Sequence, residues 1–145
     1  MPLLNDPAPA KIASLLVVDD DPQLRHLLRR ILGREGYAVA CAASGTEALE
    51  LLCEFLPDLV ILDWMMPGLD GGEVMRRTAA DPTTAAVAVM VYTASNDPGV
   101  EREAMRLGAC ACVQKVGRTA ELLERIECCL NSPRRTPPGA GDANE

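Results

Sequence analysis

The sequence predicts a single α/β domain, a doubly wound parallel sheet with helices on both faces. Short apolar segments alternate with amphipathic segments five times along the chain, a pattern typical of parallel strands joined by right-handed crossover helices. Residues Leu59 to Leu62 are apolar without interruption, as expected for a strand buried on both faces. The chain has 145 residues, 48% of them hydrophobic, which suits one domain with a sizeable core.

Segments at the two ends of the chain differ in composition from the rest. Residues 1–11 are rich in Pro and Ala, and we expect a disordered N-terminal arm. Residues 132–145 carry Pro, Arg and Thr and then Gly and Ala, which predicts a disordered Pro-rich tail. The folded domain is therefore predicted at residues 12–131.

Charge and hydropathy exclude two classes of partner. The formal net charge of -7 argues against direct binding to nucleic acid. No apolar run approaches the roughly 20 residues that span a bilayer, and the N-terminus lacks the basic start and apolar block of a signal peptide. We therefore expect a cytoplasmic protein without membrane contact.

The first strand and helix are predicted between Ser14 and Gly36. Ser14 to Val18 is apolar after its first residue and runs into three consecutive aspartates. Asp21 before Pro22 predicts a helix start, because Asp caps helices and Pro suits the first helical position. The apolar face of this helix has residues at helical spacing: Leu24, Leu27, Leu28, Ile31 and Leu32. Gly33 and Gly36 bracket its expected end.

The middle of the chain is predicted to hold two strands and two helices. Tyr37 to Ala42 is the expected second strand, and Ser44 with Glu47 forms a capping box for the helix that follows. The strand Leu59 to Leu62 ends at Asp63, after which Pro67-Gly68 forces a turn. A third helix is expected from Gly71-Gly72 to about Asp81-Pro82.

The last two strands are predicted at Ala86 to Tyr92, which ends in Thr93, and at Ala109 to Val113, which ends at Lys115. Asp97-Pro98 is the expected start of the helix between them and Gly108 its end. Thr119 is expected to cap the final helix.

The predicted strand order is the flavodoxin-like 2-1-3-4-5, whose switch point lies between strands one and three. Those strands end in Asp19-Asp20 and in Asp63, so the topology should bring these acids together although about forty residues separate them. Helix capping explains Asp21, but it does not require acids after both central strands. Clustered carboxylates are relieved by a hard divalent cation, and a few protein oxygens with retained waters describe Mg²⁺ better than Ca²⁺.

Lys115 and Thr93 end two further strands at the same rim. A cation and a hydroxyl beside a metal-bound acid suit a phosphoryl group, and a carboxylate can itself be the nucleophile that forms an aspartyl phosphate. Taken singly, Thr93 is more often a solvated strand end and Lys115 a surface lysine. Their joint position at the strand ends carries the inference.

Four segments resemble the receiver domain of bacterial two-component response regulators over about residues 12–131. They are Val17-Val18-Asp19-Asp20-Asp21-Pro22, Leu62-Asp63-Trp64-Met65-Met66-Pro67-Gly68-Leu69-Asp70-Gly71, Thr93-Ala94 and Lys115. The resemblance implies a chemotaxis-receiver-like domain that takes a phosphoryl group from a histidine kinase or phosphotransfer protein and then binds a downstream protein partner. It implies no enzyme activity beyond the domain's own phosphorylation and dephosphorylation.

The resemblance also implies a role for each site residue. Asp63 would be the phosphoacceptor. Asp20, Asp63 and the backbone carbonyl of Met65 would bind Mg²⁺ directly, and Asp19 would act through water. Lys115 would pair with the phosphoryl oxygens, and Thr93 would move toward them and report to the face made by the fourth helix, fifth strand and fifth helix.

The sequence departs from the family pattern around Lys115. Val116 follows the lysine where the family usually has Pro, and Cys112 stands three residues before it in place of the switch aromatic. Cys110 and Ala111 replace the acids that are common before that aromatic. The chemistry at Asp63 is therefore a firmer expectation than any output mechanism.

Two other functions remain open at this point. One is a receiver fold that acts only as a protein-interaction module without phosphate. The other is a phosphatase with an aspartate nucleophile, but such enzymes typically need a second acid where Met65 stands. Flavin binding is disfavoured because three acids after the first strand would repel a phosphate.

The six cysteines, Cys41, Cys53, Cys110, Cys112, Cys128 and Cys129, contain no Cys-x-x-Cys pair, and His26 is the one histidine. This spacing does not resemble a zinc site or a redox motif. We expect reduced, small core residues, with a metal-reactive Cys128-Cys129 pair as the alternative.

Overall fold

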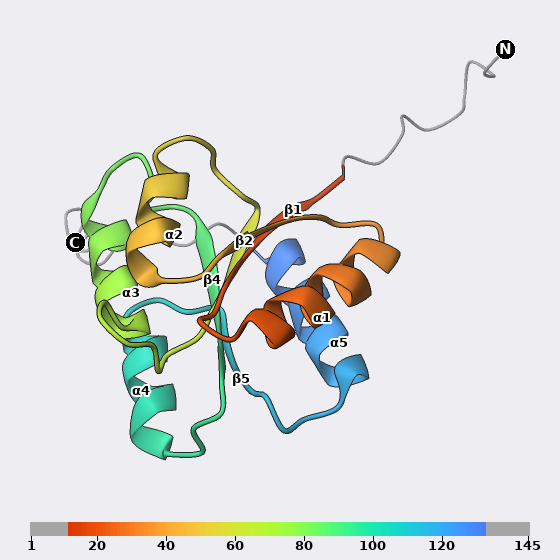
Figure 1. The fold of residues 1–145 in the computed structure, drawn as a ribbon. Coiled ribbons are helices and arrows are strands. Elements are labelled where there is room, and N and C mark those ends of the chain that lie inside the picture. Colours follow the sequence, from red (N-terminus) through yellow and green to blue (C-terminus); the bar gives the residue numbers. More distant parts are fainter. Residues whose placement is uncertain (1–11, 133–145) are drawn as a thin grey trace, which may run out of the picture.

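The computed structural model describes residues 12–132, which form five strands alternating with five helices (Figure 1). The strands are β1 (Ser14–Val18), β2 (Ala38–Ala42), β3 (Leu59–Leu62), β4 (Ala88–Thr93) and β5 (Ala111–Gln114). They form one parallel sheet in the order β2-β1-β3-β4-β5. The predicted fold class and strand order are confirmed. The predicted arm, residues 1–11, and all of the predicted tail except Ser132 lie outside the described residues.

Helices cover both faces of the sheet. They are α1 (Pro22–Arg34), α2 (Gly45–Leu52), α3 (Gly71–Ala80), α4 (Pro98–Arg106) and α5 (Thr119–Asn131). One apolar cluster joins the sheet to α2, α3 and α4, and a second joins the opposite face to α1 and α5. Figure 1 shows the same division into three layers. None of these helices is long and apolar enough to cross a bilayer.

The central strand β3 is buried at every position, as its unbroken apolar sequence predicted. Its residues alternate between the two clusters, with Leu59 and Ile61 facing α1 and α5 while Val60 and Leu62 face the other three helices. This burial holds the end of β3, and therefore Asp63, in a fixed place.

Helix starts follow the predicted capping residues with one exception. Asp21 and Asp97 each accept a hydrogen bond from the backbone two residues on, with Pro at the next position. Ser44 Oγ accepts from Glu47 N at 3.1 Å. Thr119 does not cap α5, because the helix already includes it and Arg118 stands at the cap without a side-chain hydrogen bond.

Three strands begin later than predicted because neighbouring turns hold the flanking residues. Tyr37 N donates to Leu32 O in α1, so β2 begins at Ala38. Val87 N donates to Thr84 O, so β4 begins at Ala88 instead of Ala86 and extends to Thr93. Ala109 N donates to Ala104 O in α4, so β5 runs from Ala111 to Gln114 instead of Ala109 to Val113.

The expectation that all six cysteines are reduced is wrong at two positions. Cys110, just before β5, and Cys129, in the last turn of α5, form a disulfide across a sequence separation of 19. The packing of α5 against β5 brings the two cysteines together, and their spacing in the sequence does not by itself predict that they pair. Cys41, Cys53, Cys112 and Cys128 are free.

Candidate functional site

The register of the two central strands places the first pair of acids side by side. Val18 of β1 pairs with Leu62 of β3, so Asp19 and Asp63 are the next residues on neighbouring strands. The backbone continues the ladder for one more bond, from Asp63 N to Val18 O at 2.9 Å. The acids therefore leave the sheet at one point, as the switch-point argument predicted.

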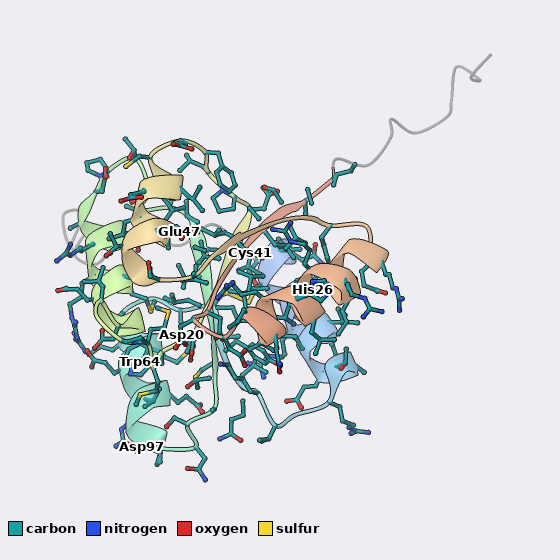
Figure 2. The ribbon with its side chains drawn as sticks, viewed as in Figure 1. Asp20, His26, Cys41, Glu47, Trp64 and Asp97 are labelled. Carbon is teal, nitrogen blue, oxygen red and sulfur yellow. A yellow bond between two sulfur atoms is a disulfide. The ribbon has the colours of Figure 1, made fainter. Side chains whose placement is uncertain are left out.

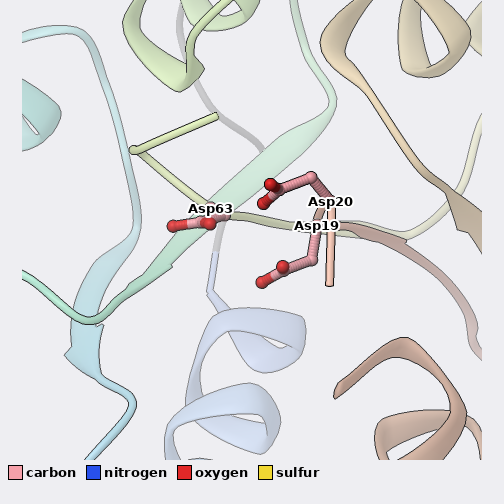
Figure 3. A group of neighbouring side chains, drawn as sticks. All are labelled: Asp19, Asp20 and Asp63. Carbon is pink, nitrogen blue, oxygen red and sulfur yellow. The ribbon is translucent and has the colours of Figure 1, made fainter. Parts of the chain in front are cut away.

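Three carboxylates meet at this edge of the sheet (Figure 3). One oxygen from each of Asp19, Asp20 and Asp63 lies within 4.8 Å of the other two. Asp19 is 2% and Asp63 5% exposed, whereas Asp20 is exposed. Hard oxygen donors that keep one side open to water fit Mg²⁺, which retains several of its own waters when it binds protein.

Lys115 reaches this cluster from the end of β5. Its Nζ lies 2.7 Å from Asp19 Oδ2 and 3.2 Å from Asp63 Oδ2. Thr93 pairs with Gln114 in the sheet, and Lys115 N then donates to Thr93 O at 2.8 Å. One ammonium thus pairs with two nearly buried carboxylates, which fixes its charge beside the proposed phosphoacceptor.

Burial is the main influence on the acidity of Asp63. It raises the pKa of this carboxyl above its usual value, the nearby charge of Lys115 lowers it, and Asp19 raises it again, with a net increase. For Lys115, burial lowers the pKa, but hydrogen bonding and charge from Asp19 and Asp63 outweigh it and raise the pKa overall. The charge of Asp19 therefore raises the pKa of Asp63 less than burial does.

Thr93 ends β4 and Met65 lies in the loop after β3, and both make contacts different from those of Lys115. Thr93 is buried at the end of β4, where its hydroxyl accepts from Ser95 N at 3.1 Å. Met65 N donates to Asp63 Oδ1 at 3.3 Å, while its side chain is 64% exposed. Among the described residues, Lys115 alone of the predicted non-acidic residues contacts the carboxylates through its side chain.

The loop beyond β3 carries Trp64, the one tryptophan of the chain. Figure 2 labels Asp20 and Trp64 at the carboxyl end of the sheet, with Asp97 at the start of α4. Trp64 directly follows Asp63, so its fluorescence is a natural probe of ion binding at the acids.

Two residues that support the site were not singled out from the sequence. Arg25 of α1 donates from Nη1 to Asp19 O at 2.7 Å, although its position on the polar face of the helix suggested only a solvated side chain. Gly71, at the start of α3, approaches so closely that a Cβ there would lie 2.5 Å from Asp63 O. The glycine pair had indicated only the start of a helix, and the contact becomes visible only in the folded structure.

The residues around Lys115 depart from the family pattern in the way the sequence indicated. Val116 is exposed, Gly117 N closes a turn onto Gln114 O at 3.1 Å, and no cis peptide bond occurs in residues 12–132. Cys112 is partly buried and packs against the cluster that includes α4.

The chain is similar to known proteins over most of its length. A family model described as "Response regulator receiver domain" matches residues 15–127. The chain is 40% identical over 131 residues to response regulator MprA of Mycolicibacterium vanbaalenii, covering 89% of this chain and 54% of that protein. It is 37% identical over 127 residues to phosphate regulon transcriptional regulatory protein PhoB of Rhizobium meliloti, covering 88% and 55%. It thus spans about half the length of these curated relatives.

Solved structures show the same fold. Chemotaxis protein CheY4 of Vibrio cholerae matches with a TM-score of 0.77 and 26% identity, covering 82% of this chain and 99% of that one. A response regulator receiver domain protein from Clostridium thermocellum matches with a TM-score of 0.76 and 30% identity, covering 83% and 95%.

Proposed function

Because the chain belongs to the response regulator receiver domain family, we propose that Asp63 accepts a phosphoryl group from a histidine kinase or a phosphotransfer protein. The observation that carries the proposal is the position of Lys115 Nζ, 3.2 Å from Asp63 Oδ2, beside three carboxylates that can share an ion. Nucleophile, counter-charge and candidate metal ligands then occupy one pocket, which is the arrangement that phosphoryl transfer needs.

Each residue has a distinct task in the proposed transfer. A carboxylate oxygen of Asp63 forms the new bond to phosphorus while the phosphorus–nitrogen bond of the donor phosphohistidine breaks. Asp20, Asp63 and the Met65 carbonyl would hold Mg²⁺ directly and Asp19 through water, and the ion would neutralise charge on the phosphoryl oxygens. Lys115 offsets further charge, and Thr93 would turn its hydroxyl toward the phosphoryl group.

The proposed output is phosphorylation-dependent binding of a downstream protein by residues 12–131. The net charge of -7 supports a protein partner over direct nucleic-acid contact, and we propose a cytoplasmic protein with no membrane contact. We propose no enzyme activity beyond the domain's own phosphorylation and dephosphorylation.

Incubation with acetyl phosphate and Mg²⁺, followed by intact mass measurement, tests the proposal. We expect one phosphoryl group on the parent chain and none on Asp63→Asn. Asp70→Asn is the matched control, because Asp70 is an exposed helix cap in the same loop, bonded to Glu73 N, and Asn caps equally well. This control should be phosphorylated like the parent.

A receiver fold used only for protein interaction predicts a different result. Trp64 fluorescence would still respond to Mg²⁺, but the parent chain would gain no phosphoryl group. The replacement of the switch aromatic by Cys112 is the observation that favours this second function, and the experiment separates the two.

Dephosphorylation should be slow because Met65 offers no polar side-chain atom to hold an attacking water. Its exposed side chain, two residues after Asp63, stands where a water would approach. Met65→Asn should speed decay of the phosphoprotein about tenfold, as expected for one hydrogen bond worth about 1.4 kcal/mol in the transition state. Decay is followed in Mg²⁺ by intact mass, beside Met105→Asn, which changes another exposed methionine on α4. Equal decay of Met65→Asn and the parent would refute the prediction.

A further inference from the structure

The disulfide lies away from the phosphorylation site and joins two elements that are otherwise held by packing. Cys110 precedes β5, which pairs with β4 at one edge of the described sheet. Cys129 lies in the last turn of α5 and is 5% exposed. The covalent loop that they close contains β5, Lys115 and most of α5, so its redox state can change how firmly this part of the chain is held.

A cavity of about 410 Å³ at the amino end of the sheet is lined in part by Cys129. Tyr37, Asp58, Glu127, Cys129 and Ser132 are among the residues that line it. Ala13 also lines it directly before β1, which places it at the end of the strands opposite the acidic cluster. Cys129, although nearly buried, therefore borders a space large enough for a small thiol.

Glutamate side chains place negative charge at this cavity. Glu127 lines it, and no lysine or arginine among residues 12–132 does so. The pKa of the Tyr37 phenol is raised, first by burial and then by the charges of Glu127 and Glu35, so negative charge also acts on this residue. Such a cavity favours neutral or cationic small molecules and disfavours anionic ones.

We propose that Cys110–Cys129 is a reversible thiol–disulfide exchange site that reacts with small neutral or cationic thiols entering through this cavity. The thiolate attacks Cys129 Sγ, the Cys129–Cys110 bond breaks, and Cys110 leaves as a thiolate that takes up a proton. A second thiol then releases Cys129 from the mixed disulfide. The net reaction converts two thiols and the protein disulfide into one small disulfide and two protein thiols, and it runs in reverse when small disulfides are abundant.

The reduced state has a place for the freed thiol. Cys110 Sγ lies 3.3 Å from Val89 O, so the Cys110 thiol can donate a hydrogen bond there. Beyond Cys129, hydrogen bonds from Ser132 to Cys128 O and Cys129 O hold the end of α5. Reduction should therefore leave the fold intact and loosen the last turn of α5.

To test the proposal, the full chain is oxidised with hydroxyethyl disulfide, its free thiols are alkylated, and the protein is examined for cross-linked peptides. A peptide cross-linked between Cys110 and Cys129 is expected, absent in Cys129→Ser and present in Cys128→Ser, the matched change at the exposed neighbour. On reduction, hydrogen exchange of the last turn of α5 should rise several-fold. Cross-linking through Cys128, or exchange that does not change on reduction, would overturn the proposal.

The dependence of the reduction rate on the charge of the thiol tests entry through the cavity. The rate at which the cationic thiol cysteamine reduces the protein disulfide is compared with the rate for the anionic thiol 2-mercaptoethanesulfonate. Each rate is divided by the rate at which the same thiol reduces hydroxyethyl disulfide. We expect a normalised preference of about tenfold for cysteamine at low salt, which falls as salt is added. Glu127→Gln should reduce the preference to about threefold. A normalised ratio near one in the parent chain would overturn entry through the cavity. These measurements use no phosphodonor, so they stand or fall independently of Asp63 phosphorylation.

Discussion

Replacing Lys115 with methionine should lower the free energy of unfolding by about 2 kcal/mol at neutral pH without divalent cations. Its Nζ pairs with both Asp19 and Asp63, which are almost fully buried. Removing one partner of a buried pair typically costs about 3–5 kcal/mol because an uncompensated charge remains. The Lys115 side chain is 20% exposed, so water screens part of that cost.

The stability that Lys115→Met loses relative to the parent chain should become smaller as the pH falls. The folded protein already holds the proton of Asp63 more tightly than the unfolded chain does, since burial raises its pKa. A group of this kind contributes stability below its unfolded pKa, about 3.9 for Asp, and loses it as the pH rises through the raised folded value. Lys115→Met removes the positive charge that opposes the increase in the pKa of Asp63. As the pH rises from the unfolded pKa to the folded one, the variant should therefore lose more stability than the parent.

Urea unfolding at several pH values, followed by Trp64 fluorescence, measures the effect. Arg106→Met is the control, because Arg106 pairs with Glu103 at 2.6 Å but is 66% exposed, and such surface pairs contribute little to stability. Added Mg²⁺ should narrow the gap between Lys115→Met and the parent, since the ion offsets the same carboxylates. A Lys115→Met variant as stable as the parent at neutral pH would mean that the pairing contributes nothing.

The acid cluster could be predicted because it depends on topology alone. Strand alternation indicated the order of the sheet, and the order placed Asp19, Asp20 and Asp63 at neighbouring strand ends. Lys115 followed by the same reasoning, since it directly follows β5. These inferences required only the position of each residue relative to the end of its strand.

The features that could not be predicted depend on side-chain reach and on contacts between distant elements. Arg25 contacts the backbone of Asp19 from a helix face that otherwise meets solvent, and hydrophobic periodicity cannot detect such a contact. The Cys110–Cys129 pair depends on the packing of α5 against β5. Strand ends near Val87 and Ala109 depend on turn hydrogen bonds that apolar composition does not encode.

Gly71→Ala should destabilise the domain by about 2 kcal/mol and slow phosphorylation of Asp63, because the new methyl group meets backbone on two sides. A Cβ at Gly71 would lie 2.5 Å from Asp63 O and 2.8 Å from Trp64 Cα. No side chain can rotate away to relieve these contacts, so either α3 or the Asp63 loop must shift, at the cost typical of overpacking. Displacement of that loop would also disturb the carboxylate geometry.

Two further glycines separate the effect on stability from the effect on the site. Gly33, inside α1, has nothing within 4 Å of the position that a Cβ would take, so Gly33→Ala should stabilise the chain by about 0.5–1 kcal/mol. A Cβ at Gly45 would meet Leu69 O at 2.7 Å, and its nearest atoms do not include Asp63. Gly45→Ala should therefore destabilise the fold while the folded protein still takes a phosphoryl group at the parent rate. Unfolding curves and acetyl phosphate labelling of all three variants measure both effects. If Gly71→Ala were as stable and as readily phosphorylated as Gly33→Ala, the close approach of α3 to Asp63 would have no structural role.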